Sequence, residues 1–318
     1  MTTAPPRCSL VVPVYGNADT ITDLVEAIAV LAVDAPGGLE AVFVIDGSPD
    51  DSEARLRSLL PSQSFPSAVL VHARNFGSFA AIRTGMAHAR GDLIAVMAAD
   101  LQEPPALIGE FLRVLDTGDA DVVVGCRTGR ADPASSRRAA ETFWRIYRRF
   151  VQAEMPEGGI DVFACNRVAR DTLLSMQESN SSLVGLLIWM GFTRVEVPYE
   201  RLPRPSGESG WTFKKKVRYM SDSIFSFTDL PIRVLLLVGT LGSAITLLLS
   251  VVIAVAWAAG LVSVQGYTPL MLAVLFVGTL ILAGLGVVGS YVWRTFENTK
   301  GRPLSIVRAV HTFNGPRS

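Results

Sequence analysis

Cysteine and histidine are scarce, with three of each among the 318 residues. The cysteines Cys8, Cys126 and Cys165 are odd in number and lie far apart, without the spacing of metal ligands. This pattern argues against a disulfide framework or a zinc site and indicates a reducing compartment. An excess of positive charge is also missing, because 29 Lys and Arg residues balance 29 Asp and Glu residues. The chain as a whole therefore gives no sign of a nucleic-acid partner.

Charge is absent altogether between Arg233 and Arg294. Two apolar runs, residues 232–257 and 269–293, each exceed the ~20 residues that a helix needs to cross a bilayer. Aromatic residues lie near their ends, as is typical at membrane interfaces: Trp257, Tyr267, Tyr291 and Trp293. We therefore expect a two-helix transmembrane hairpin over residues 232–293. A buried core hairpin is the alternative.

The orientation of this hairpin follows from the basic residues on both sides of it. These are Lys214, Lys215, Lys216, Arg218 and Arg233 before it, and Arg294, Lys300, Arg302 and Arg308 after it. The positive-inside rule places both flanks in the cytoplasm, and the first residues lack a signal-peptide pattern. We therefore expect a multi-pass protein of the inner (plasma) membrane with a cytoplasmic catalytic domain. Small residues spaced by four, Gly239 with Ser243 and Gly286 with Ser290, are consistent with helix packing or a homo-oligomer.

The first part of the chain alternates between strand-like and helix-like segments. Continuous apolar runs cover residues 9–15, 41–45, 68–72, 93–98 and 121–125, and helical patterns cover 20–33, 51–60, 78–89 and 105–115. Continuous apolar strands indicate a sheet covered on both faces. The predicted fold class is thus α/β, a mostly parallel sheet with helices on both faces. Ligands of such sheets bind at the carboxyl ends of the strands.

Three later segments are predicted to lie at the membrane or at the sheet edge. Residues 135–150 form a basic, aromatic amphipathic pattern, which is typical of an interfacial helix or of a core helix with a solvated face. Residues 211–231 mix aromatics with lysines, as expected of interfacial helices. In the tail, residues 301–310 read as a strand that adds to a cytosolic sheet edge, of this chain or of a neighbouring subunit.

An acidic residue and an amide follow the fourth apolar run, in the stretch AVMAADLQEPP. On an extended segment the side chains of Asp100 and Gln102 would point the same way and could share a hard divalent cation such as Mg²⁺. That cation would keep open positions for diphosphate oxygens. The alternative is that Asp100 caps the helix that the double proline opens.

Five segments of the chain, in this order and spacing, resemble the family 2 glycosyltransferases that use polyprenyl phosphate acceptors. The segments are VVPVYGN, VIDGSPDDS, ARNFGSFAAIRTGMAHARGD, MAADLQEPP and RPSGESGWTFKKK. This group contains the dolichol-phosphate mannose synthases and the bactoprenol glucosyltransferases, and the resemblance covers almost the entire chain. It implies a Rossmann-like GT-A nucleotide-sugar fold over residues 1–210, followed by the interfacial helices, the hairpin and a cytosolic tail over 294–318.

The same resemblance implies the reaction and its residues. A sugar would pass with inversion from a nucleoside-diphosphate sugar, a UDP-hexose, to undecaprenyl phosphate on the cytoplasmic membrane face. Pro13, Tyr15, Asp46, Asn75 and Asp100 would bind the nucleotide sugar, and Asp100 with Gln102 would hold Mg²⁺ or Mn²⁺. Arg127, Arg138, Thr142, Arg201, Arg204 and Ser209 would bind the acceptor phosphate. Asp161 would serve as base or position the sugar. The alternative is that Asp161 is an ordinary turn residue.

The chain departs from the family pattern at several positions. Ala98 stands where relatives carry a carboxylate, and Ile45 replaces the first residue of an acidic pair. These departures leave the donor base open and suggest a second possibility, a catalytically silent scaffold of a lipid-linked sugar pathway. A third possibility, a processive polysaccharide synthase, would carry more spans and a Gln-x-x-Arg-Trp stretch, and neither is found in the sequence.

Overall fold

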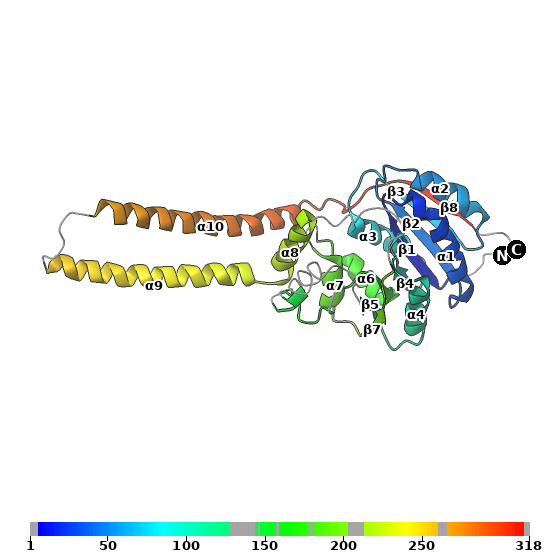
Figure 1. The fold of residues 1–318 in the computed structure, drawn as a ribbon, viewed down its shortest axis with the longest axis horizontal. Helices are drawn as coiled ribbons and strands as arrows, with labels where there is room; N and C mark the ends of the chain where they lie inside the picture. The colour runs from blue at the N-terminus through cyan, green and yellow to red at the C-terminus, as the bar shows by residue number, and fades with distance from the viewer. Residues whose placement is uncertain are drawn as a thin grey trace.

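The structure is a computed structural model of the chain. It describes residues 6–127, 144–145, 147–149, 151–156, 159–178, 181–202, 213–259 and 266–314. Figure 1 shows a globular part from which two long helices extend side by side. Both ends of the chain lie on the side of the globular part that is remote from these helices (Figure 1).

The globular part is built on an eight-stranded mixed sheet with the order β7-β5-β6-β4-β1-β2-β3-β8. The strands are β1 (Cys8–Val14), β2 (Leu39–Ile45), β3 (Ser67–His72), β4 (Leu93–Val96), β5 (Val122–Arg127), β6 (Phe163–Asn166), β7 (Arg194–Tyr199) and β8 (Val307–Phe313). β1 pairs in parallel with β2 and β4, β2 with β3, and β5 with β7. β6 runs antiparallel between β4 and β5. The predicted mostly parallel sheet is confirmed.

Helices cover both faces of this sheet, as the continuous apolar strands predict. The helices of the globular part are α1 (Ile21–Asp34), α2 (Ser52–Leu59), α3 (Ser78–His88), α4 (Pro105–Asp116), α6 (Arg167–Ser175) and α7 (Leu183–Trp189). α1, α2 and α4 pack with one set of alternating strand residues, such as Val12 and Phe43. α3, α6 and α7 pack with the opposite set, such as Val11 and Val44. Strands β1 to β5 are therefore buried on both sides along most of their length, which explains their lack of apolar-polar alternation. The edge strands β7 and β8 are partly exposed.

The predicted tail strand joins the sheet of its own chain. β8 pairs antiparallel with β3, with Ser67 opposite Phe313 and Leu70 opposite Val310. It begins at Val307, six residues later than the sequence pattern suggested. The chain thus leaves the globular part through the long helices and returns to complete its edge (Figure 1).

The long helices are α9 (Leu230–Ala258) and α10 (Tyr267–Thr299), and α8 (Phe213–Phe227) precedes them. Among the described residues, Phe276–Thr299 of α10 is long and apolar enough to cross a membrane. Met220–Phe227 and Leu230–Gly242 meet the same criteria only together, with a bend of 76° between them. Apolar side chains on both helices are exposed, Leu282 by 71%. One candidate span is thus found, and the second span of the expected hairpin stays a prediction.

The described part of the predicted 135–150 helix lies against the protein core. Tyr147 is fully buried, and its ring meets that of Trp144 edge to face at a centroid distance of 5.4 Å. A Cβ atom on Gly159 would overlap the Trp144 ring. These contacts fit the core-helix interpretation for this portion.

Candidate active site

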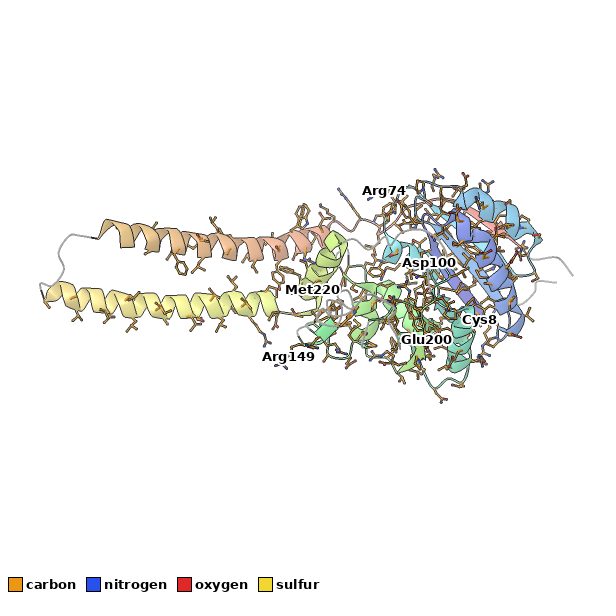
Figure 2. All side chains as sticks on the ribbon, viewed as in Figure 1. Cys8, Arg74, Asp100, Arg149, Glu200 and Met220 are labelled. Carbon is orange, nitrogen blue, oxygen red and sulfur yellow. The ribbon has the colours of Figure 1, made fainter. Side chains whose placement is uncertain are left out.

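The carboxyl ends of the parallel strands meet at one edge of the sheet, and this edge faces the long helices. Cys8 begins β1 on the remote side, whereas Arg74 after β3 and Asp100 after β4 lie nearer to α9 and α10 (Figure 2). Ligands of open α/β sheets bind at this edge. It is therefore the candidate active site.

Asp46, directly after β2, is buried and holds the loop that follows β3. Its carboxylate accepts hydrogen bonds from the backbone N–H groups of Phe76 and Gly77, each at 2.8 Å, and from His72 Nδ1 at 2.8 Å. Burial by itself would raise the pKa of Asp46, but these hydrogen bonds hold it below its ordinary value. The carboxylate thus shapes the loop that carries Asn75. Direct contact of Asp46 with a nucleotide stays a prediction.

A second group of hydrogen bonds joins the loops after β1 and β2. Ser48 Oγ accepts the N–H of Gly16 at 2.8 Å and donates to Asp50 Oδ1 at 2.6 Å. Asp50 Oδ2 accepts the N–H of Ala18 at 2.8 Å. Tyr15 stands on this joined surface with 54% of its area exposed. The exposed Tyr15 ring thus stands beside loop backbone that these hydrogen bonds hold in place. Such a surface is suited to stacking with a planar nucleotide base.

Asp100 lies on a turn and not on an extended segment, which corrects the sequence argument for its pairing with Gln102. β4 ends at Val96, and Leu101 has a positive φ of 54°. It is the only non-glycine residue with positive φ among the described parts of the chain. Backbone strain of this kind concentrates at functional sites. The helix-cap alternative for Asp100 is also excluded, because α4 begins at Pro105 and Pro104 occupies the N-cap position.

Gln102 bonds the segment after β4 to the segment after β7. Its backbone carbonyl accepts the N–H of Leu202 at 2.9 Å, and its side-chain Nε2 donates to the Leu202 carbonyl at 3.3 Å. Because the amide nitrogen is used in this way, the amide oxygen is the atom that Gln102 could offer to a metal ion.

Glu103 and Arg201 meet at the same place. Arg201 Nε lies 3.7 Å from Glu103 Oε1, and the Glu103 side chain is almost completely buried. Burial, aided by the carboxylate of Asp100, raises the pKa of Glu103 to about 7 against the opposing charge of Arg201. Glu103 Oε2 and Arg201 Nε have no hydrogen-bond partner among the described residues. Buried polar atoms are rarely left unpaired, so a ligand or ordered water is expected here.

Arg127, the last residue of β5, contacts the carboxylate of Asp161 just before β6. Tyr199 at the end of β7 lies with its hydroxyl 3.4 Å from Asp161 Oδ2. Position 125 requires a glycine, because a Cβ atom on Gly125 would stand 2.5 Å from Val162 Cγ1 and 3.0 Å from the Tyr199 ring.

The Nε atom of Arg127 has no hydrogen-bond partner within the described parts of the chain. Burial would lower the pKa of Arg127, but the charge of Asp161 raises it.

The donor set at this edge fits a divalent cation only if substrate oxygens complete the coordination. In the described residues, no group of three or more His, Cys, Asp and Glu side chains could hold a metal ion. Asp100 supplies one carboxylate and Gln102 one amide oxygen, and Ala98 supplies no ligand. Mg²⁺ commonly binds to one or two carboxylates, with waters and substrate phosphates completing its shell.

The structure brings most of the predicted site residues to this edge. Arg127, Arg201, Asp161, Asp100 and Gln102 gather around Glu103, and Pro13, Tyr15, Asp46 and Asn75 lie at the ends of β1, β2 and β3. Arg138, Thr142, Arg204 and Ser209 lie outside the described residues.

Sequence reasoning missed two residues of this site, Glu103 and Tyr199. Glu103 stands within the LQEPP stretch, where a carboxylate followed by two prolines resembles a simple helix start. Tyr199 ends an alternating strand in which it looks like an ordinary core residue.

Comparison with known proteins points to one family. The model of the family described as "Glycosyl transferase family 2" matches residues 9–175. The putative glycosyltransferase CsbB of Bacillus subtilis (strain 168) is 30% identical over 96% of this chain and 92% of that protein. The SfII prophage-derived bactoprenol glucosyl transferase of Shigella flexneri is 30% identical over 97% of this chain and 99% of that protein. Among solved structures, a Mycobacterium tuberculosis glucosyl-3-phosphoglycerate synthase complex with Mg²⁺ and uridine diphosphate is 17% identical over 69% of this chain and 77% of that chain, with a TM-score of 0.47.

Proposed function

Because the chain belongs to glycosyl transferase family 2, we propose that it transfers a sugar from a nucleoside-diphosphate sugar to polyprenyl phosphate. The donor is a UDP-hexose, the acceptor is undecaprenyl phosphate, and the product is a polyprenyl-phosphate monosaccharide. Similarity over nearly the full length to a bactoprenol glucosyl transferase supports this acceptor class. The globular part is then a GT-A catalytic domain.

The observation that carries the proposal is the arrangement of Arg127 and Arg201 at the edge facing the long helices. Each guanidinium has a buried Nε atom without a hydrogen-bond partner among the described residues. Guanidinium groups pair with phosphate through two parallel N–H donors. A lipid phosphate that enters from the side of α9 and α10 would satisfy both arginines, and Glu103 holds one of them in place.

The donor lies across the ends of β1, β2 and β3. Tyr15 and Pro13 contact the base, and the loop with Asn75, held by Asp46, lies against the ribose and diphosphate. Asp100 and Gln102 would hold a Mg²⁺ or Mn²⁺ ion, which when bound draws negative charge from the departing diphosphate.

The reaction is a single displacement with inversion at the anomeric carbon. An oxygen of the acceptor phosphate attacks that carbon, and the bond to the nucleoside diphosphate breaks on the opposite side. A phosphate monoester has its second pKa near ~6, so the acceptor is already anionic at neutral pH and needs little help from a base. Asp161 therefore acts mainly by orienting Arg127 and the sugar, since its carboxylate is engaged with that arginine.

The membrane attachment completes the proposal. α9 and α10 form a two-helix hairpin, α8 lies at the cytoplasmic interface, and the catalytic domain is cytoplasmic. The return of the chain to the sheet through β8 supports an even number of crossings. The small-residue faces of the two helices pack within the hairpin or in a homo-oligomer.

A catalytically silent scaffold is the second candidate function. It is favoured by Ala98 and by the absence, among the described residues, of any group of three or more His, Cys, Asp and Glu side chains that could hold a metal ion. The two functions differ in one simple property, since a scaffold transfers no sugar with any donor.

The test uses the full-length protein purified in detergent, with undecaprenyl phosphate, Mg²⁺ and a panel of radiolabelled UDP-, GDP- and dTDP-sugars. We expect label to enter the butanol-soluble fraction with one donor and to stop when EDTA is added. The Asp100→Ala variant serves as the inactive control. If no donor yields butanol-soluble label while the protein remains folded, the transferase proposal is wrong and the scaffold is favoured.

A further inference from the structure

A continuous chain of side-chain hydrogen bonds runs from the donor edge of the sheet to the segment that follows α10. His72 Nδ1 lies 2.8 Å from Asp46 Oδ1, and His72 Nε2 lies 2.9 Å from Thr84 Oγ1. Thr84 Oγ1 in turn lies 2.7 Å from Ser305 Oγ. We call Asp46, His72, Thr84 and Ser305 the tail relay. It joins β2, β3, α3 and the C-terminal tail.

The direction of the hydrogen bond between Asp46 and His72 follows from the donors available. An ionised Asp46 only accepts, so the hydrogen of this pair is on His72 Nδ1. The Thr84 hydroxyl also lies 2.9 Å from the Ala80 carbonyl oxygen, to which it can donate. Between the Thr84 and Ser305 hydroxyls, either oxygen can be the donor. Both ring nitrogens of His72 are used, and the ring is buried.

The tail also contacts the donor loop through its backbone. Ala73 donates its N–H to the Ile306 carbonyl at 2.9 Å, directly before the loop that Asp46 holds. On the other side, a Cβ atom on Gly47 would stand 2.5 Å from the carbonyl carbon of Arg74. The loop with Arg74 and Asn75 is thus enclosed between the loop after β2 and the tail that returns from α10.

We propose that His72 is a positioning residue for the donor site and that Ser305 makes the tail after α10 a part of that site. His72 acts through Asp46, whose carboxylate receives the N–H groups of Phe76 and Gly77. Ser305 acts through Thr84, which fixes the ring plane of His72. This inference rests on the proposed function, because it assumes that the loop holding Asn75 receives the donor.

The geometry favours this role over simple packing. A buried aliphatic residue at position 72 would fill the same volume without the cost of burying polar atoms. A buried histidine bonded at both nitrogens instead fixes a carboxylate in one orientation. That orientation decides where the two loop N–H groups point and therefore the shape of the donor surface.

The first test compares variants in the transfer assay with UDP-glucose as donor and undecaprenyl phosphate as acceptor. We expect His72→Ala to raise the donor KM about tenfold or more, as for the loss of a hydrogen bond to a buried charge. Ser305→Ala should raise it about threefold. The kcat and the acceptor KM should stay within about twofold of the wild type, since the relay does not reach the acceptor groups.

Two further variants make this test specific. His72→Asn retains an N–H near the position of Nδ1 and should recover most of the donor affinity. Thr312 lies on the exposed side of β8, outside the relay. Thr312→Ala should therefore leave kcat and both KM values unchanged. The proposal is overturned if His72→Ala and Ser305→Ala leave the donor KM unchanged, or if they lower kcat and raise both KM values alike.

The second test is independent of turnover. Hydrogen exchange of the Phe76 and Gly77 amides should become at least about tenfold faster in His72→Ala, while the amides of β2 keep wild-type protection. Unchanged exchange at the two loop amides, or faster exchange across the whole sheet, would contradict the positioning role. This measurement separates the two hypotheses, because it gives a result even if the wild-type protein transfers no sugar.

Discussion

Arg127 and Asp161 contact each other across the ends of β5 and β6. The residue expected to bind the acceptor phosphate and the residue expected to act as base are therefore one ion pair. Their functions cannot be separated by single substitutions, because the loss of either partner leaves the other with an uncompensated charge.

The first prediction concerns this pair. Arg127→Lys should raise the acceptor KM by about tenfold, because lysine cannot reproduce two-point binding of phosphate. Asp161→Asn should lower turnover. The loss of kcat/KM in the double variant, expressed as a free energy, should be smaller than the sum of the two single losses. Steady-state kinetics of the four proteins in the cycle measure the coupling. Full additivity would show that the contact has no role in the reaction, and unchanged turnover of Asp161→Asn with intact binding would remove its assigned role.

The second prediction concerns the glycine that allows this pair to form. Gly125→Ala should destabilise the protein by ~1–3 kcal/mol through overpacking against Val162 and Tyr199, and it should lower activity by shifting Arg127. Thermal unfolding and the transfer assay measure the two effects. Gly109→Ala in α4 is the matched control, because its added methyl would meet only Leu31 of α1, at 3.4 Å. This substitution should be neutral or stabilising. Equal behaviour of both variants would contradict the packing argument.

The third prediction is a pH dependence at Asp46. Its folded pKa lies below the ordinary value of 3.8, so its stabilising contribution is complete above that pH and is lost as the pH falls through the folded pKa. Asp46→Asn should therefore destabilise the protein by ~1–3 kcal/mol at neutral pH and by progressively less below pH ~4. Melting temperatures of both proteins across this range give the difference. A difference that grows on acidification would be contrary to this prediction.

The fourth prediction concerns the membrane hairpin. In a variant without the natural cysteines, Gly266→Cys should react with a membrane-impermeant thiol reagent applied to intact cells. Asn314→Cys in the tail should react only after the cells are opened. If both positions react from the same side, the hairpin does not span the membrane twice.

Much of the globular part could be predicted because its signals are local. Uninterrupted apolar runs located the strands from β1 to β5, since strands buried on both faces tolerate few polar residues. The location of the strand-end residues at one edge could also be predicted, because parallel strands bring their carboxyl ends to the same edge of a sheet. The strand character of the tail was also visible, but its partner β3 depends on a contact between residues more than 200 positions apart.

The finer arrangement of the site could not be predicted. The pairing of Arg201 with Glu103 joins segments that are far apart in the chain. The local LQEPP sequence does not predict this pairing. The left-handed conformation of Leu101 also has no local signal, because leucine rarely adopts it without tertiary constraints. His72 appeared to be one more residue of a buried strand, and only the structure shows that both of its nitrogens are bonded.

The most direct test of the central claim is a cryo-EM structure of the protein in lipid with Mn²⁺ and a non-transferable UDP-sugar analogue. We expect the diphosphate beside Asp100, the base against Tyr15, and the anomeric carbon turned towards Arg127 and Arg201. A map with the nucleotide bound elsewhere, or with this edge empty at saturating analogue, would contradict the account.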